Sequence, residues 1–91
     1  MKKIRAAVRI TGLVQGVGFR YFVYHNAVNL GVNGRVQNTA DGAVEAVFEG
    51  EEDTVGRMVS LCGEGPGAAR VENTEVEYEA PRGEFSGFRL A

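Results

Sequence analysis

The stretch IRAAVRITGLVQGVGFRYFVYHNAVNLG, residues 4–31, joins a strand pattern to a helix pattern through a glycine-rich loop. Apolar positions alternate with mostly polar ones from Ile4 to Ile10, which is typical of a half-buried β-strand. From Phe19 onward apolar residues recur at helical spacing as far as Gly31, and a glycine in that place favours the end of a helix. A strand, a loop and a helix therefore form the first unit of the fold.

The rest of the chain continues this pattern of strands and helices. The sequence TADG at 39–42 is a turn signal between two apolar stretches, so we expect a hairpin there. Val71 falls out of phase with the alternation at 74–79, which predicts a bulge or a strand start near residues 72–73. The remaining expected elements are strands at 32–38 and 44–48, a helix after Gly50 with an apolar stripe at Val55, Met58, Val59 and Cys62, a strand at 74–79 and a short strand at 85–90.

This order of elements predicts the fold class. The β-α-β-β-α-β order with a short extra strand indicates an α+β ferredoxin-like sandwich, in which two helices pack on one face of an antiparallel sheet. A chain of 91 residues can bury one core, so we expect a single domain spanning residues 1–91. Many unrelated functions use this architecture, so function has to be argued from a site.

Composition and charge narrow the class of protein further. Hydrophobic residues make up 44% and charged residues 24% of the chain, which is ordinary for a soluble globular domain. The net charge of −2 provides no general attraction for nucleic acid, and no apolar run is long enough to span a membrane. Lys2 and Lys3 are not followed by the apolar core of a signal peptide, and Cys62 has no cysteine partner. We expect a cytoplasmic monomer that binds neither nucleic acid nor membrane.

The glycine-rich loop between the first strand and the first helix is suited to an anion. Gly12, Gly16 and Gly18 allow backbone conformations that turn successive N–H groups toward one point, and such nests bind anions. The helix that begins near Arg20 adds unpaired N–H groups and the positive end of its dipole. The guanidinium of Arg20 can grip two oxygens of a phosphate. The loop therefore favours a small oxyanion, above all a phosphoryl group.

Three stretches resemble the signatures of the acylphosphatase family. Residues 10–20 (ITGLVQGVGFR) resemble the first signature, and residues 34–50, which begin GRVQN, resemble the second. The segments 65–71 and 83–88 are similar to the C-terminal third of the family, so the resemblance covers essentially the whole chain. Arg35 departs from the pattern, because an aromatic residue usually follows the glycine there.

The resemblance implies a reaction and the residues that perform it. The reaction is the hydrolysis of the carboxyl-phosphate bond of acyl phosphates, which yields a carboxylate and inorganic phosphate. Arg20 and Asn38 are implied as catalytic residues: the arginine holds the phosphoryl group and the asparagine amide orients the attacking water. The phosphate-binding loop is expected to consist of Gln15, Gly16, Val17, Gly18, Phe19 and Arg20.

The residues themselves are consistent with these roles. By alternation Asn38 shares a face with Val36, the side on which the helices pack, so Arg20 is expected beside it. Gln15 is expected either to contact the substrate or to cap the loop. No His and Cys cluster has metal-ligand spacing and the P-loop and dinucleotide motifs are absent, so neither metal nor cofactor is expected.

Two other functions compete with the enzyme. A non-catalytic module of the same fold could bind phosphate or an acyl phosphate without turnover. An RNA-binding domain shares the order of elements, but it needs stacking aromatic residues on the open side of the sheet. The residues expected there, such as Arg35, Glu45 and Glu75, do not fit that need. His25 is expected at the surface without a role in proton transfer, and Cys62 is expected in the core.

Overall fold

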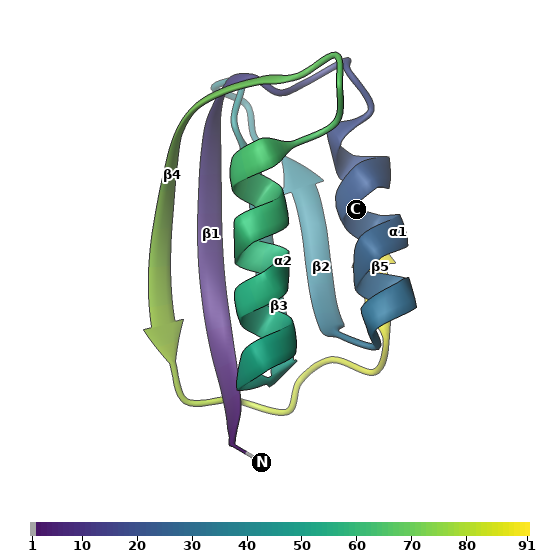
Figure 1. Ribbon diagram of the computed structural model, residues 1–91, viewed down its shortest axis with the longest axis vertical. Coiled ribbons are helices and arrows are strands. Elements are labelled where there is room, and N and C mark those ends of the chain that lie inside the picture. Colours follow the sequence, from purple (N-terminus) through teal and green to yellow (C-terminus); the bar gives the residue numbers. More distant parts are fainter. Residues whose placement is uncertain (1) are drawn as a thin grey trace.

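The computed structural model describes residues 2–91 as two helices packed against a sheet (Figure 1). Both helices cover the same face of the sheet, and we call the other side the open face. The elements are β1 (Lys3–Leu13), α1 (Phe19–Leu30), β2 (Asn33–Asn38), β3 (Val44–Glu51), α2 (Glu52–Glu64), β4 (Arg70–Glu79) and β5 (Phe88–Leu90). This arrangement confirms the predicted ferredoxin-like α+β fold.

The sheet is mixed, because one of its edge strands runs parallel to its neighbour. Its order is β4-β1-β3-β2-β5, and the pairs β1–β3, β1–β4 and β2–β3 are antiparallel. β5 pairs with β2 in parallel, so the prediction of an antiparallel sheet is wrong at this edge. The cause is the connection after β4. It runs along the bottom edge of the sheet in Figure 1, from the end of β4 to the start of β2, so β5 leaves this edge in the same direction as β2.

The predicted bulge lies in β4 opposite the end of β1. Thr11 pairs with Asn73 and Gly12 pairs with Val71, so Glu72 has no partner in the ladder. A Cβ atom on Gly12 would lie 2.2 Å from the carbonyl oxygen of Arg70, closer than real atoms approach. Glycine is therefore required where the bulge brings the two strands together.

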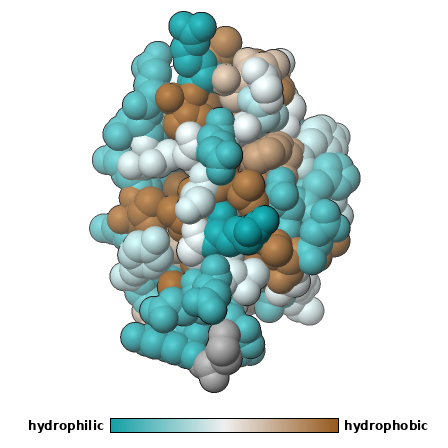
Figure 2. Space-filling view, in the orientation of Figure 1, coloured by the Kyte–Doolittle hydropathy of each residue, from teal (hydrophilic) through white to brown (hydrophobic). Residues whose placement is uncertain are grey.

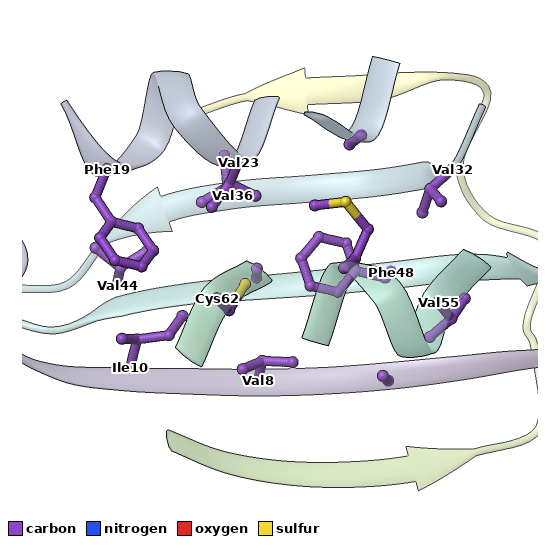
Figure 3. Close-up of a cluster of buried hydrophobic side chains, with 14 of the residues drawn as sticks. Val8, Ile10, Phe19, Val23, Val32, Val36, Val44, Phe48, Val55 and Cys62 are labelled. Carbon is purple, nitrogen blue, oxygen red and sulfur yellow. The ribbon is translucent and has the colours of Figure 1, made fainter. Parts of the chain in front are cut away.

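The hydrophobic core lies between the helices and the sheet (Figure 3). Val44, Ala46 and Phe48 are buried on the inward face of β3, as their alternation predicts. Cys62 of α2 is also fully buried, and this burial raises the pKa of its thiol to about 12. His25 is exposed on the outer side of α1, beside the rings of Tyr21 and Tyr24.

A buried ion cluster ties the connection between β4 and β5 to the open face. Arg5 of β1 and Glu49 of β3 are directly paired in the sheet, both are 6% exposed, and Nη1 of Arg5 lies 2.6 Å from Oε2 of Glu49. The carboxylate of Glu49 also accepts hydrogen bonds from the backbone N–H groups of Arg82 and Gly83, at 3.0 and 3.1 Å. The Arg5 guanidinium lies 2.7 Å from a carboxylate oxygen of Glu84. We call Arg5, Glu49, Arg82, Gly83 and Glu84 the Arg5 cluster.

The surface on the helix side is mixed in polarity. Apolar residues on this face lie in small groups separated by hydrophilic ones (Figure 2). Within residues 2–91, neither helix is long and apolar enough to cross a membrane.

Candidate functional site

The predicted site residues come from two neighbouring connections at one end of the sheet. The loop between β1 and α1 and the turn between β2 and β3 lie at the end opposite the N-terminus (Figure 1). They lie there because β1 and β2 both run toward this end, since each is antiparallel to β3 between them.

The loop before α1 contains two glycines in the left-handed conformation, which anion-binding nests use. Gly16 and Gly18 have φ values of 74° and 80°, and a side chain at either position would meet open space. Gly18 is the N-cap of α1, and its carbonyl accepts the first helical hydrogen bond from Phe22. Within residues 2–91, the N–H groups of residues 16–20 donate to no other protein group. These donors are therefore available to a ligand at the positive end of the helix dipole.

Gln15 joins this loop to the turn between β2 and β3. Its amide nitrogen Nε2 donates to the carbonyl oxygens of Thr39 and Ala43, both at 2.8 Å. Of the two roles left open by the sequence, the structure therefore supports capping, because both donors of the amide are already used. Gln15 holds the loop against the residue that follows Asn38.

A second set of contacts shapes the turn itself. The Thr39 hydroxyl accepts a hydrogen bond from the N–H of Ala43 at 3.0 Å and contacts the carboxylate of Asp41. Asp41 also forms an ion pair with Arg9, which lies 3.1 Å from Glu45. The contacts from Thr39 and Arg9 lower the pKa of Asp41, so this carboxylate stays ionised at neutral pH.

Arg20 lies in the first turn of α1 and is held by the end of the chain. Its Nη1 donates to the main-chain oxygen of Ala91 at 2.7 Å. The N–H of Ala91 in turn donates to the carbonyl of Val36 at 2.9 Å, so β2 and Arg20 are linked through this residue. Arg20 is half-buried, and the rest of its guanidinium remains free to bind an anion.

Asn38 is the last residue of β2 and pairs with Val44 of β3. Val36, two residues earlier, is fully buried, while Asn38 is exposed where the strand leaves the core. Within residues 2–91, its side-chain amide makes no hydrogen bond. The structure thus brings Asn38 beside the Gln15 bridge, with its amide available to a water or a substrate.

The predicted site residues offer a ligand backbone N–H groups, one side-chain amide and the guanidinium of Arg20. Backbone N–H groups and the Arg20 guanidinium favour an oxyanion, and the Asn38 amide can both donate and accept. Within residues 2–91, no three His, Cys, Asp or Glu side chains lie together in a way that could hold a metal ion.

Sequence reasoning missed two contributors to the site. Ala91 acts through its main chain, so no side-chain signal marks it as the partner of Arg20. Arg9 acts on the turn through Asp41, which lies 32 positions away in the chain. The alternation of Arg9 with Val8 and Ile10 places it on the open face, but only the register of the strands shows that it reaches Glu45 and the turn.

The fold and the site together define a small ferredoxin-like α+β domain with a loop suited to oxyanions. The family model for acylphosphatase matches residues 6–90. An acylphosphatase of a Nostoc species is 56% identical over 87 residues, which cover 96% of this chain and 85% of the relative. An acylphosphatase of Pelotomaculum thermopropionicum is 47% identical over 91 residues, which cover 100% of this chain and 99% of the relative.

Solved structures agree with the family match. The crystal structure of an acylphosphatase from Bacillus subtilis superimposes with a TM-score of 0.92 at 31% identity, and the match covers 97% of this chain and 98% of that one. The chain belongs to the acylphosphatase family, whose members are enzymes. This membership supports hydrolysis of acyl phosphates over a non-catalytic binding module.

Proposed function

We propose that the protein hydrolyses acyl phosphates without a metal ion, with Arg20 and the N–H groups of the loop at residues 15–20 holding the phosphoryl group. The observation that carries this proposal is that, within residues 2–91, the N–H groups of residues 16–20 donate to no other protein group, while Arg20 lies in the first turn of α1 and donates one hydrogen bond, to Ala91. A phosphoryl group bound there accepts hydrogen bonds from donors that are already oriented, so little reorganisation is needed as charge moves onto its oxygens.

Asn38 orients the attacking water in this proposal. Its amide accepts a hydrogen bond from the water and aligns the water oxygen with the phosphorus, opposite the bond to the acyl oxygen. The new P–O bond forms as the bond to the acyl oxygen breaks, and the carboxylate leaves with the electron pair. The proton of the water passes to the phosphate or to solvent, so the products are a carboxylate and inorganic phosphate.

No strong acid or base is needed for this reaction. A carboxylate is a stable anion and leaves without being protonated, so catalysis reduces to positioning and charge stabilisation. Asp41 is the carboxylate of the neighbouring turn, but Thr39 and Arg9 occupy it and lower its pKa. We therefore assign Asp41 no proton transfer and expect the rate to be set by Arg20 and Asn38.

The test is hydrolysis of benzoyl phosphate with EDTA present, for the wild type and two variants. Arg20→Ala should lose at least ~10²-fold in rate and bind phosphate weakly, because a charged donor to the transition state is removed. Asn38→Ala should lose turnover but keep most of its phosphate affinity, measured by calorimetry.

Matched controls separate these roles from general damage. Arg57 of α2 and Asn29 of α1 are exposed, so Arg57→Ala and Asn29→Ala should hydrolyse the substrate as the wild type does. Equal and small losses in Arg20→Ala and Asn38→Ala would contradict the division of roles. Phosphate binding without turnover in the wild type would instead indicate the binding module.

We also infer that residues 1–91 act as one cytoplasmic, monomeric domain on small acyl phosphates. One core cluster draws buried residues from β1, β2, β3, α1 and α2, which supports a single domain. The lone thiol is buried, as suits a reducing compartment. Acidic residues on the open face, such as Glu75 and Glu77, disfavour the binding of nucleic acid. Size-exclusion chromatography with light scattering tests whether the protein is a monomer.

A further inference from the structure

Two arginines lie side by side at one edge of the open face. Arg35 of β2 and Arg89 of β5 are register partners in the parallel pair. Their neighbours Val36 and Leu90 point toward the core, so both arginines point away from the helices. Both are exposed. Like charges on directly paired strand positions repel each other, so this pair weakens the attachment of a strand only three residues long.

Within the described part of the chain, no carboxylate neutralises either arginine. Among residues 2–91, Arg35 and Arg89 form no salt bridge, whereas Arg5, Arg9 and Arg82 all do. The residue of β3 that pairs with Arg35 is Val47, which carries no charge. The carboxylates on either side of Val47 are already engaged, because Glu45 pairs with Arg9 and Glu49 with Arg5.

The two guanidinium groups line a hollow large enough for a ligand. It has a volume of about 530 Å³ and lies between the edge of the sheet and the connection that leads into β5. Its lining residues are Arg35, Arg89, Glu84, Phe85, Ser86 and Gly87. Glu84 is the one acidic residue among them, and its carboxylate lies 2.7 Å from the Arg5 guanidinium. The hollow therefore offers the Ser86 hydroxyl and two guanidinium groups that form no salt bridge within residues 2–91.

We propose that Arg35 and Arg89 form a second anion site, separate from the loop at residues 15–20, which binds the phosphate group of a small phosphorylated molecule or inorganic phosphate. A phosphate dianion matches the two positive charges, and its oxygens can be shared between two guanidinium forks. A single carboxylate would leave one of the two charges uncompensated.

Binding at this site stabilises the partner of Arg20. An anion that bridges β2 and β5 removes the repulsion between Arg35 and Arg89 and so holds β5 against β2. The residue after β5 is Ala91, whose N–H donates to Val36 and whose oxygen accepts from Arg20. The second site is thus connected to Arg20 through two hydrogen bonds of one residue.

The test is a titration of the ¹⁵N-labelled protein with inorganic phosphate, followed by NMR at constant ionic strength. Two groups of amides should shift with different affinities: residues 16–20 at the loop, and residues 34–36 with 86–90 at the second site. In the double variant Arg35→Gln, Arg89→Gln the second group should lose affinity by roughly tenfold or more, because both charged donors are gone. The first group should respond as in the wild type.

A double variant with the same change in charge is the control. Arg57 and Arg70 are exposed and form no salt bridge within residues 2–91, so Arg57→Gln, Arg70→Gln should keep both responses. Hydrogen exchange of the Ala91 amide gives a second readout: phosphate should slow it in the wild type and the control but not in Arg35→Gln, Arg89→Gln.

Three results would overturn the proposal. The amides of residues 34–36 and 86–90 could fail to respond to phosphate, or could respond equally in both double variants. Chloride could produce the same shifts as phosphate at equal ionic strength. That result would show that Arg35 and Arg89 respond to anions in general and do not form a phosphate site.

Discussion

Arg5 and Arg20 lie near opposite ends of the sheet and have very different surroundings. Arg5 is 6% exposed and lies within 3.3 Å of carboxylate oxygens of Glu49, Glu79 and Glu84. Arg20 is half-buried and, within residues 2–91, donates one hydrogen bond, to the main-chain oxygen of Ala91.

The difference separates a structural arginine from one that is available to a ligand. The charge of Arg5 is balanced by carboxylates that also fasten the connection between β4 and β5. Removing one partner should therefore lower the free energy of unfolding. Among residues 2–91 no Asp or Glu side chain forms a salt bridge with Arg20, and the neighbouring N–H groups of residues 16–20 donate to no other protein group. Changes in the Arg5 cluster should therefore alter stability, and changes near Arg20 should alter catalysis.

The largest effect is expected from breaking the Arg5 cluster with Glu49→Gln. The change leaves Arg5 without its closest partner, and removing one member of a buried ion pair should lower the free energy of unfolding by about 3 kcal/mol. Urea denaturation measures this loss. Glu77→Gln, on the exposed part of β4, should change stability by less than about 0.5 kcal/mol. The rate per folded molecule should be unchanged in both, and a rate loss in Glu49→Gln would contradict a purely structural role for the Arg5 cluster.

Acid should weaken the same cluster in the wild type. Burial opposes ionisation of Glu49, but the hydrogen bonds from Arg82, Arg5 and Gly83 outweigh it, so the pKa of Glu49 lies below its ordinary value of 4.5. Between the two pKa values the unfolded chain binds more protons, so stability rises with pH there. The contribution of Glu49 is thus present above pH 4.5 and is lost as the pH falls through the lower value.

Urea denaturation between pH 3 and 7 follows this dependence, and Glu49→Gln serves as its reference. The variant should show a flatter fall in stability on the acid side, because it cannot bind the proton. Parallel curves for the two proteins would show that Glu49 does not carry the dependence.

Gln15→Ala should lower stability less than Glu49→Gln does and, unlike that change, should also lower the catalytic rate. The change removes both hydrogen bonds to the turn at Thr39 and Ala43, which should cost about 1–2 kcal/mol of stability. The loop should then hold its N–H groups less well relative to Asn38, and we expect kcat/KM for benzoyl phosphate to fall roughly tenfold. Gln37→Ala, on the open face of β2, is the control and should keep the wild-type rate. A stability loss with an unchanged rate would make Gln15 purely structural.

The smallest effect is expected at Cys62. Its thiol is buried and its pKa is raised to about 12, so at pH 8 almost no thiolate forms and no reagent reaches it. A thiol reagent such as DTNB should leave the folded protein unmodified and fully active, and should label it once urea unfolds it. Rapid labelling with loss of activity in the folded state would contradict a core role.

Much of the fold was predictable because its signals are local. Three of these signals each depend on a few neighbouring residues: the alternation from Ile4 to Ile10, the turn at 39–42 and the break in alternation at Val71. They correspond to an observed strand, hairpin and bulge. The direction of β5 was not predictable. It depends on where the connection after β4 delivers the chain, and the Arg5 cluster, whose members are far apart in sequence, fastens that connection.

The candidate site also has some features that local sequence patterns predict and others that they do not. The glycine loop and Arg20 are contiguous, so their suitability for an oxyanion follows from the sequence. The roles of Arg20 and Asn38 in the reaction stay predictions that the variants above test. The bridge from Gln15 to the turn and the contact of Arg20 with Ala91 connect positions 24 and 71 residues apart, and no local pattern reports such contacts.

Local patterns in the sequence are enough to predict the order of elements, the residues of the core and the loop suited to an anion, because strand alternation, helical spacing and glycine conformation act over a few residues. Contacts between distant parts of the chain establish the parallel edge strand, the burial of Arg5 beside Glu49 and the pairing of Arg35 with Arg89. Which charges meet a partner and which remain free depends on the register between strands, and that register is set when the whole sheet packs against its helices.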